Sequence, residues 1–178
     1  IVVGTVLVSY FNQPVPFDPD YPVRRLLIIS GGVVVVTVGA CLVAWKTGRL
    51  YGFIFGATAG SYIGITMVFG DVALIAAGND FLGQLSNPYP YVAITIGTCA
   101  LALTQLAFFR GRALLVVPTI NSFMIAGPPV LEYVVVGTAL TMMQLVGMAV
   151  IVAGVVVLTT APEGTAAGGQ AADSKPSP

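Results

Sequence analysis

The chain has 178 residues, of which 57% are hydrophobic and 8% charged, and its formal net charge is zero with no histidine. This composition excludes an ordinary water-soluble domain, and the absence of a basic block argues against a nucleic-acid partner. With no histidine and only two cysteines, the chain also lacks the usual ligands of zinc and haem, so we expect no metal and no cofactor.

The beginning of the chain predicts the end of a helix followed by a connector. Residues 1–11 are apolar, but a helix of this length reaches only about half a bilayer. We therefore expect the chain to begin inside a truncated transmembrane helix of a longer protein. Residues 12–25 contain four prolines, which prevent a regular helix. They predict an extended extracytoplasmic connector between two bundles.

Five long apolar stretches fill most of the remaining chain. They lie at 26–45, 50–77, 91–109, 113–131 and 134–160. A continuous apolar run of about 20 residues is what a helix needs to cross a hydrocarbon core about 30 Å thick, and lipid excludes open sheets. The sequence therefore predicts an all-α, polytopic transmembrane helix bundle over 26–160, with five complete spans plus a partial first helix. Its principal partner is the lipid bilayer.

The charges between the spans predict an orientation. One side of the membrane would carry four cations and no acid: Lys46, Arg49, Arg110 and Arg112. The other side mixes two arginines with acidic residues. An excess of Lys and Arg in short loops marks the cytoplasmic face. We therefore predict a multi-pass protein of the cell membrane with a cytoplasmic C-terminus, whose tail 161–178, rich in Ala, Gly, Ser and Pro, is disordered.

The second complete span carries glycine at every fourth position. These residues are Gly52, Gly56, Gly60 and Gly64. Glycines with this spacing form a smooth groove along one helix face, which allows a neighbouring helix to approach closely. The pattern predicts a helix-packing face, and the alternative is that this seam lets two helices slide during a transport cycle.

A few polar side chains within the spans are candidates for a substrate cavity. The amides of Gln105 and Asn121 cannot be satisfied within their own helix as hydroxyls can, so they should face the bundle interior or a water-filled cavity. Pro118 frees a carbonyl near Asn121 and Ser122. We take Gln105, Asn121, Ser122 and Tyr62 as the cavity candidates. Interhelical hydrogen bonding by the amides and a purely structural kink at the proline are the alternatives.

Charged residues at the span ends suggest little further chemistry. Asp71 and Glu132 border membrane segments, where a carboxylate acts in proton coupling or is simply solvated at the interface. Lys46 lies at a membrane edge and Lys175 in the tail, so neither can serve as the base of a serine nucleophile. We therefore expect that the protein is not an enzyme.

Residues 101–158 resemble the last three helices of the drug/metabolite transporter superfamily, in its EamA-like group. The likeness rests on Gln105 with the helix-ending Arg110–Gly111, Pro118, the turn at Gly137, and Gln144–Leu145–Val146–Gly147 followed by Gly154–Val155. Family members typically have ten helices in two inverted five-helix repeats with substrate between them. The resemblance implies that this chain is the carboxy-terminal five-helix repeat. It departs from the family at Thr138, where many members have Glu, and near Asp71, where members often have Lys.

Two classes of function follow. The first is half of a secondary transporter that moves a small-molecule substrate by alternating access, with the missing amino-terminal repeat as its partner. The second is a non-transporting membrane subunit packed in a larger membrane complex. The amide-poor spans favour the second class over an ion-coupled carrier, whereas the resemblance favours the first.

Overall fold

The computed structural model describes residues 3–4, 22–48, 50–77, 81–137 and 140–160, and within these ranges it contains helices and no strand. Six helices are defined: α2 (Val23–Thr47), α3 (Tyr51–Ala76), α4 (Phe81–Leu85), α5 (Tyr89–Arg110), α6 (Ala113–Val136) and α7 (Met142–Thr160). The predicted truncated helix 1–11, apart from residues 3–4, lies outside the described residues. So do most of the connector 12–25 and the tail 161–178.

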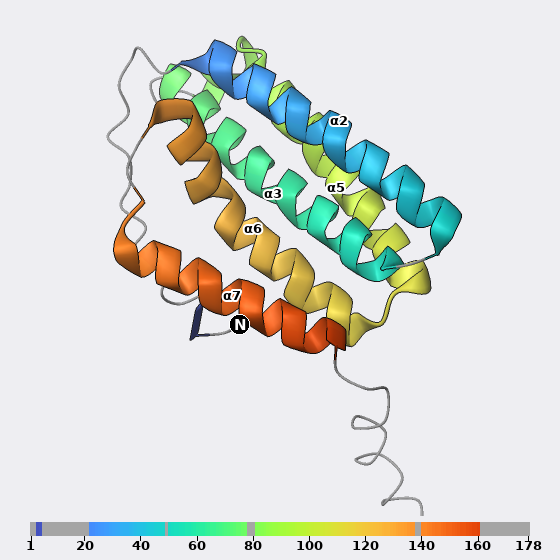
Figure 1. The fold of residues 1–178 in the computed structure, drawn as a ribbon. Helices are drawn as coiled ribbons and strands as arrows, with labels where there is room; N and C mark the ends of the chain where they lie inside the picture. The colour runs from blue at the N-terminus through green and yellow to red at the C-terminus, as the bar shows by residue number, and fades with distance from the viewer. Residues whose placement is uncertain (1–2, 5–21, 49, 78–80, 138–139, 161–178) are drawn as a thin grey trace, which may run out of the picture.

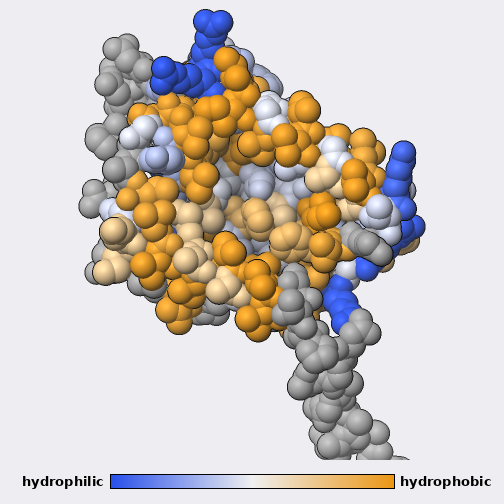
Figure 2. Space-filling view, viewed as in Figure 1, coloured by the Kyte–Doolittle hydropathy of each residue, from blue (hydrophilic) through white to orange (hydrophobic). Residues whose placement is uncertain are grey.

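Four helices, α2, α3, α5 and α6, are long and apolar enough to cross a membrane. The apolar part of α7, Met142–Val157, is shorter. The all-α prediction is confirmed, and the four helices indicate a membrane protein, but five complete spans are not established. Figure 2 shows hydrophobic residues over most of the visible face, with the strongly hydrophilic residues near the ends of the helices.

Helix α3 is the centre of the bundle. It packs along α5 and α6 and also contacts α2, while α7 lies on the outer side of α6 (Figure 1). Half of the most apolar window of α3 is buried, against 17% of the corresponding window in α2 and in α5. Helix α2 has a higher mean hydropathy than α3 yet is less buried, so position in the bundle rather than composition determines which side chains are buried.

Two clusters of buried side chains hold the opposite ends of the bundle together. At the end where α2 begins, Leu26 packs with Phe69 and Val135. At the other end, Ala44 packs with Phe55 and Val116. Each cluster joins α2, α3, α5 and α6.

The contact between α3 and α6 is close because glycines on α3 face the backbone of α6 and, at Gly52, that of the α5–α6 turn. A methyl group built on Gly52 would lie 2.8 Å from the Gly111 Cα atom, and one on Gly60 would collide with the carbonyl oxygen of Ile120. At Gly64 the nearest atom would be Pro128 Cδ, at 3.1 Å. The absence of side chains on this face therefore allows the two helices to approach.

Several helix boundaries differ from those expected. Helix α2 begins at Val23, three residues earlier, because the carbonyl of Pro22 accepts hydrogen bonds from the amides of Arg25 and Leu26. The short helix α4 was not predicted. The earlier start of α2 places Arg24 and Arg25 in the first turn of a helix and not in the expected connector.

Helix α6 continues through Pro128 and Pro129 to Val136, five residues beyond the expected end at 131. A proline deprives the carbonyl one turn earlier of its donor. Here the carbonyl of Met124 lies beside Gly64, as does the Pro128 ring, so the α3 glycine face accommodates the break. The turn comes instead at Gly137, whose φ of 81° is left-handed, and α7 begins at Met142 rather than at 134.

Candidate functional site

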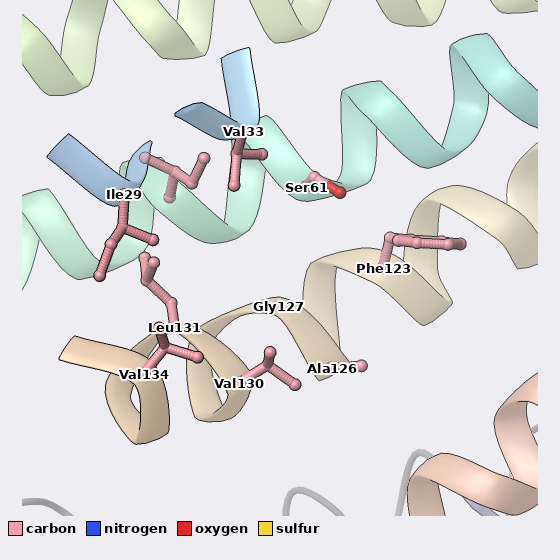
Figure 3. A pocket seen from close by; sticks show the side chains of 10 residues that line it. Ile29, Val33, Ser61, Phe123, Ala126, Gly127, Val130, Leu131 and Val134 are labelled. Atoms are coloured by element: carbon pink, nitrogen blue, oxygen red, sulfur yellow. The ribbon is translucent and has the colours of Figure 1, made fainter. Parts of the chain in front are cut away.

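A groove of about 350 Å³ opens between α2, α3 and α6. Its lining comes from all three helices: Ile29 and Val33 of α2, Ser61 and Ile65 of α3, and Phe123, Ala126, Gly127, Val130, Leu131 and Val134 of α6. Figure 3 shows these side chains around the space between the three helices. One turn of a helix about 10 Å across fills roughly 400 Å³. The groove therefore suits a slender molecule or the side chains of a neighbouring helix.

The groove wall is almost entirely hydrocarbon. Its one hydroxyl, on Ser61, donates a hydrogen bond to the Ala57 carbonyl in its own helix at 2.9 Å. A polar occupant would consequently find no other hydroxyl, amide or charged side chain among the lining residues. The groove in this form is suited to apolar groups.

The predicted cavity residues Ser122 and Tyr62 lie in the packed interior rather than in the groove. Ser122 is 2% exposed, and its hydroxyl donates to the Pro118 carbonyl at 2.6 Å. Tyr62 is 4% exposed, and its hydroxyl is hydrogen-bonded to the Thr37 hydroxyl at 3.2 Å. Both hydroxyls are therefore engaged, the first within α6 and the second in a link between α3 and α2.

Gln105 and Asn121 are exposed on the surface of the bundle. Asn121 lies about 12 Å along α6 from its first residue, and Gln105 about 8 Å from the last residue of α5, at the same end of the bundle. Among the described residues, neither amide has a hydrogen-bond partner. The structure does not bring either residue to the groove, and their helices, α5 and α6, pack along α3 with few contacts to each other.

The charged residues divide between the two ends of the bundle. The structure describes two acids, Asp71 near the end of α3 and Glu132 near the end of α6. They lie at the same end of the bundle and are close enough to interact electrostatically. Lys46, Arg110 and Arg112 lie at the other end, where α2 and α5 end and α6 begins. Because Arg24 and Arg25 begin α2 at the same end as the two acids, that end has charges of both signs, whereas the charged residues described at the other end are all basic.

At the basic end, Arg110 lies over two aromatic rings. Its guanidinium carbon is 5.5 Å from the centre of the Trp45 ring and 5.6 Å from that of Tyr51. Tyr51 stacks in turn on Phe55, with ring centres 4.2 Å apart. The short α2–α3 turn, in which Gly48 and Leu50 both have positive φ, brings Trp45 and Tyr51 together. We call Trp45, Tyr51 and Arg110 the aromatic platform.

The groove residues and the aromatic platform were not predicted from the sequence. Ile29, Val130 and their neighbours have the same composition as side chains that face lipid, so hydropathy gives no signal for a groove. For the platform a signal existed, because Trp45 and Tyr51 bracket a short basic loop with a glycine in it. That pattern places two aromatic rings at one helix end, but it does not show that Arg110, from another hairpin, lies over them.

Comparison with known proteins identifies no relative: no family model, no curated protein and no solved structure matches the chain.

Proposed function

We propose that this chain forms half of a membrane transporter, in which a second helical repeat covers the exposed amides and a small molecule passes between the two halves. In this proposal the helices α2 to α7 include five spans, and the C-terminus is cytoplasmic. The likeness of residues 101–158 to EamA-like transporters is one support, and the exposed position of Asn121 is the other.

Asn121 carries the argument because of its depth and exposure. It lies in an apolar helix at a distance from the helix end that corresponds to the interior of a bilayer. A primary amide that faces hydrocarbon without a partner costs at least a few kcal/mol. A protein surface or a water-filled cavity must therefore cover this part of α6, and Gln105 has the same requirement on α5.

The alternative is a non-transporting subunit of a larger membrane complex. The observation that favours it is the apolar groove, which contains no free polar group for a hydrated substrate. In that case the amides would be hydrogen-bonded to a partner subunit instead of lining an aqueous path. The two functions thus differ in whether water reaches Asn121.

Aqueous thiol labelling distinguishes the two functions. Cys41 and Cys99 are replaced by alanine, and Asn121→Cys is compared in intact membranes with Val36→Cys, an α2 position that is 71% exposed and faces lipid in this proposal. A transporter half predicts that a membrane-impermeant maleimide labels position 121 much faster than position 36. Equal, negligible labelling of both would contradict an aqueous path and favour the subunit.

Transport itself can be measured before the substrate is identified. The natural protein is reconstituted with its partners into vesicles, which are exposed to a mixture of small metabolites, and the lumen is analysed by mass spectrometry. The proposal predicts that at least one compound accumulates and that Asn121→Leu, reconstituted in equal amount, loses this accumulation. Unchanged accumulation in the variant would exclude Asn121 from the substrate path.

A further inference from the structure

We propose that the aromatic platform at the basic end of the bundle binds the headgroup phosphate of an anionic phospholipid. The proposal is independent of transport, because it rests on the ends of α2, α3, α5 and α6 rather than on the groove or the exposed amides.

The charge of this end matches an anion. Lys46 lies in the last turn of α2, Arg110 ends α5, and Arg112 precedes α6. The two acids that the structure describes lie toward the opposite end. Each lysine or arginine held near an anionic membrane surface strengthens binding by about fivefold. The three cations therefore favour an anionic headgroup over a zwitterionic one.

The platform gives Arg110 a geometry that suits phosphate. The guanidinium carbon lies over the rings of Trp45 and Tyr51, and the negative faces of these rings hold the cation at the end of the bundle. The Arg110 side chain is exposed, and a guanidinium edge donates two parallel hydrogen bonds to a phosphate. Among the described residues, Arg110 forms no ion pair that would compete.

The depth of the platform identifies the source of the phosphate. Trp45 is 50% exposed at the end of an apolar span, and indole rings at span ends prefer the headgroup level of the bilayer. A cation in contact with this ring lies at the same level. Because phospholipid phosphates are concentrated there, a lipid headgroup rather than a soluble anion is the expected occupant.

Native mass spectrometry of the purified full-length chain tests the proposal by counting retained lipids. Phosphatidylglycerol and phosphatidylcholine are added in equal amounts, and the natural protein should retain the anionic lipid preferentially. Arg110→Gln should reduce this retention by about fivefold or more. Arg110→Lys keeps the charge but loses the planar fork, so its retention of the anionic lipid should lie between that of the natural protein and that of Arg110→Gln.

Two further variants serve as controls. Tyr51→Phe keeps the ring and removes only a buried hydroxyl, so retention should be unchanged. Arg24→Gln removes a cation at the other end of α2 and should also have no effect.

Equal retention of the two lipids would overturn the proposal, as would an equal loss in Arg24→Gln and Arg110→Gln. Displacement by millimolar inorganic phosphate would show a site for soluble anions and would equally overturn it. If Arg110→Gln fails to fold, lipid retention by Arg110→Lys is compared with that by Arg24→Lys, and equal retention by these two variants would overturn the proposal.

Discussion

The glycines of α2 and α3 occupy opposite environments although both helices are apolar and similar in length. On α2, a methyl group added at Gly31, Gly32 or Gly39 would meet nothing within 4 Å. On α3, the same addition at Gly52 or Gly60 would run into the backbone of a neighbouring hairpin. The α2 glycines thus make no close helix contact, whereas the α3 glycines at positions 52, 56, 60 and 64 determine how closely helices approach.

The difference shows what spacing adds to composition. The α3 glycines recur every four residues and so lie on one face, which a partner helix can follow over several turns. In α2 no such row exists, since Gly31 and Gly32 are adjacent and Gly39 lies seven residues beyond. Apolar side chains gain little free energy when they move from lipid into the protein interior. The row of small residues therefore determines which helix becomes central.

The largest effect is expected from Gly60→Ala. The added methyl group would collide with the Ile120 carbonyl oxygen and would lie 2.9 Å from Phe123 Cβ, so α3 and α6 must separate. We expect a loss of about 3 kcal/mol in unfolding free energy, measured by denaturation in mixed micelles. Gly70→Ala on the same helix is the control. It has open space and should gain about 0.5 kcal/mol from its better helix propensity. Equal stability of the two variants would contradict the packing described here.

A smaller effect should separate two isoleucines, one on each helix. Ile65 of α3 is 4% exposed and Ile28 of α2 is 64% exposed. Ile65→Ala leaves a cavity between helices and should cost about 2 kcal/mol. By contrast, Ile28→Ala leaves no cavity between helices, because lipid chains fill the space. It should change stability by less than about 0.5 kcal/mol. If Ile28→Ala were the more damaging variant in the same assay, α2 rather than α3 would be the central helix.

The smallest effect concerns the link between α2 and α3. Thr37→Val removes the hydrogen bond to the Tyr62 hydroxyl and should cost about 0.6 kcal/mol, the average for such bonds between membrane helices. Thr95→Val provides a matched control, because the Thr95 hydroxyl donates only to the Tyr91 carbonyl within α5. A larger loss in the control would show that bonds within a helix, not between helices, dominate these threonine effects.

The elements were more predictable from the sequence than their environments. Apolar runs of sufficient length predicted every long helix, and the spacing of Gly52 to Gly64 predicted a packing face on α3. Hydropathy could not distinguish Ile28 from Ile65, because lipid and protein interior are equally apolar. The sequence placed the end of α6 at 131, five residues too early, because the effect of Pro128 and Pro129 depends on whether a neighbour such as Gly64 can accept the ring and the freed carbonyl.

The candidate site was less accessible to sequence reasoning for the same reason. Ser122 and Tyr62 are polar residues in apolar helices, which suggested a cavity, but a hydroxyl can bond to its own helix or to one neighbour, and both do. Asn121 and Gln105 have no such route, and their exposure leaves a face of the bundle that another surface or water must cover. Only the position of each side chain relative to neighbouring helices separates these cases.

The packing of α3 against α6 is tested most directly by a disulfide between Gly56→Cys and Thr119→Cys, with Cys41 and Cys99 replaced by alanine. A Cβ atom built on Gly56 lies 3.6 Å from Thr119 Cβ, within the range that a disulfide bridges without backbone movement. Mild oxidation in native membranes should therefore remove both thiols, as counted by alkylation and intact mass, while Gly70→Cys with Thr119→Cys stays reduced. If the 56–119 pair stayed reduced, or if the control pair oxidised equally, the contact between the glycine face of α3 and α6 would be contradicted.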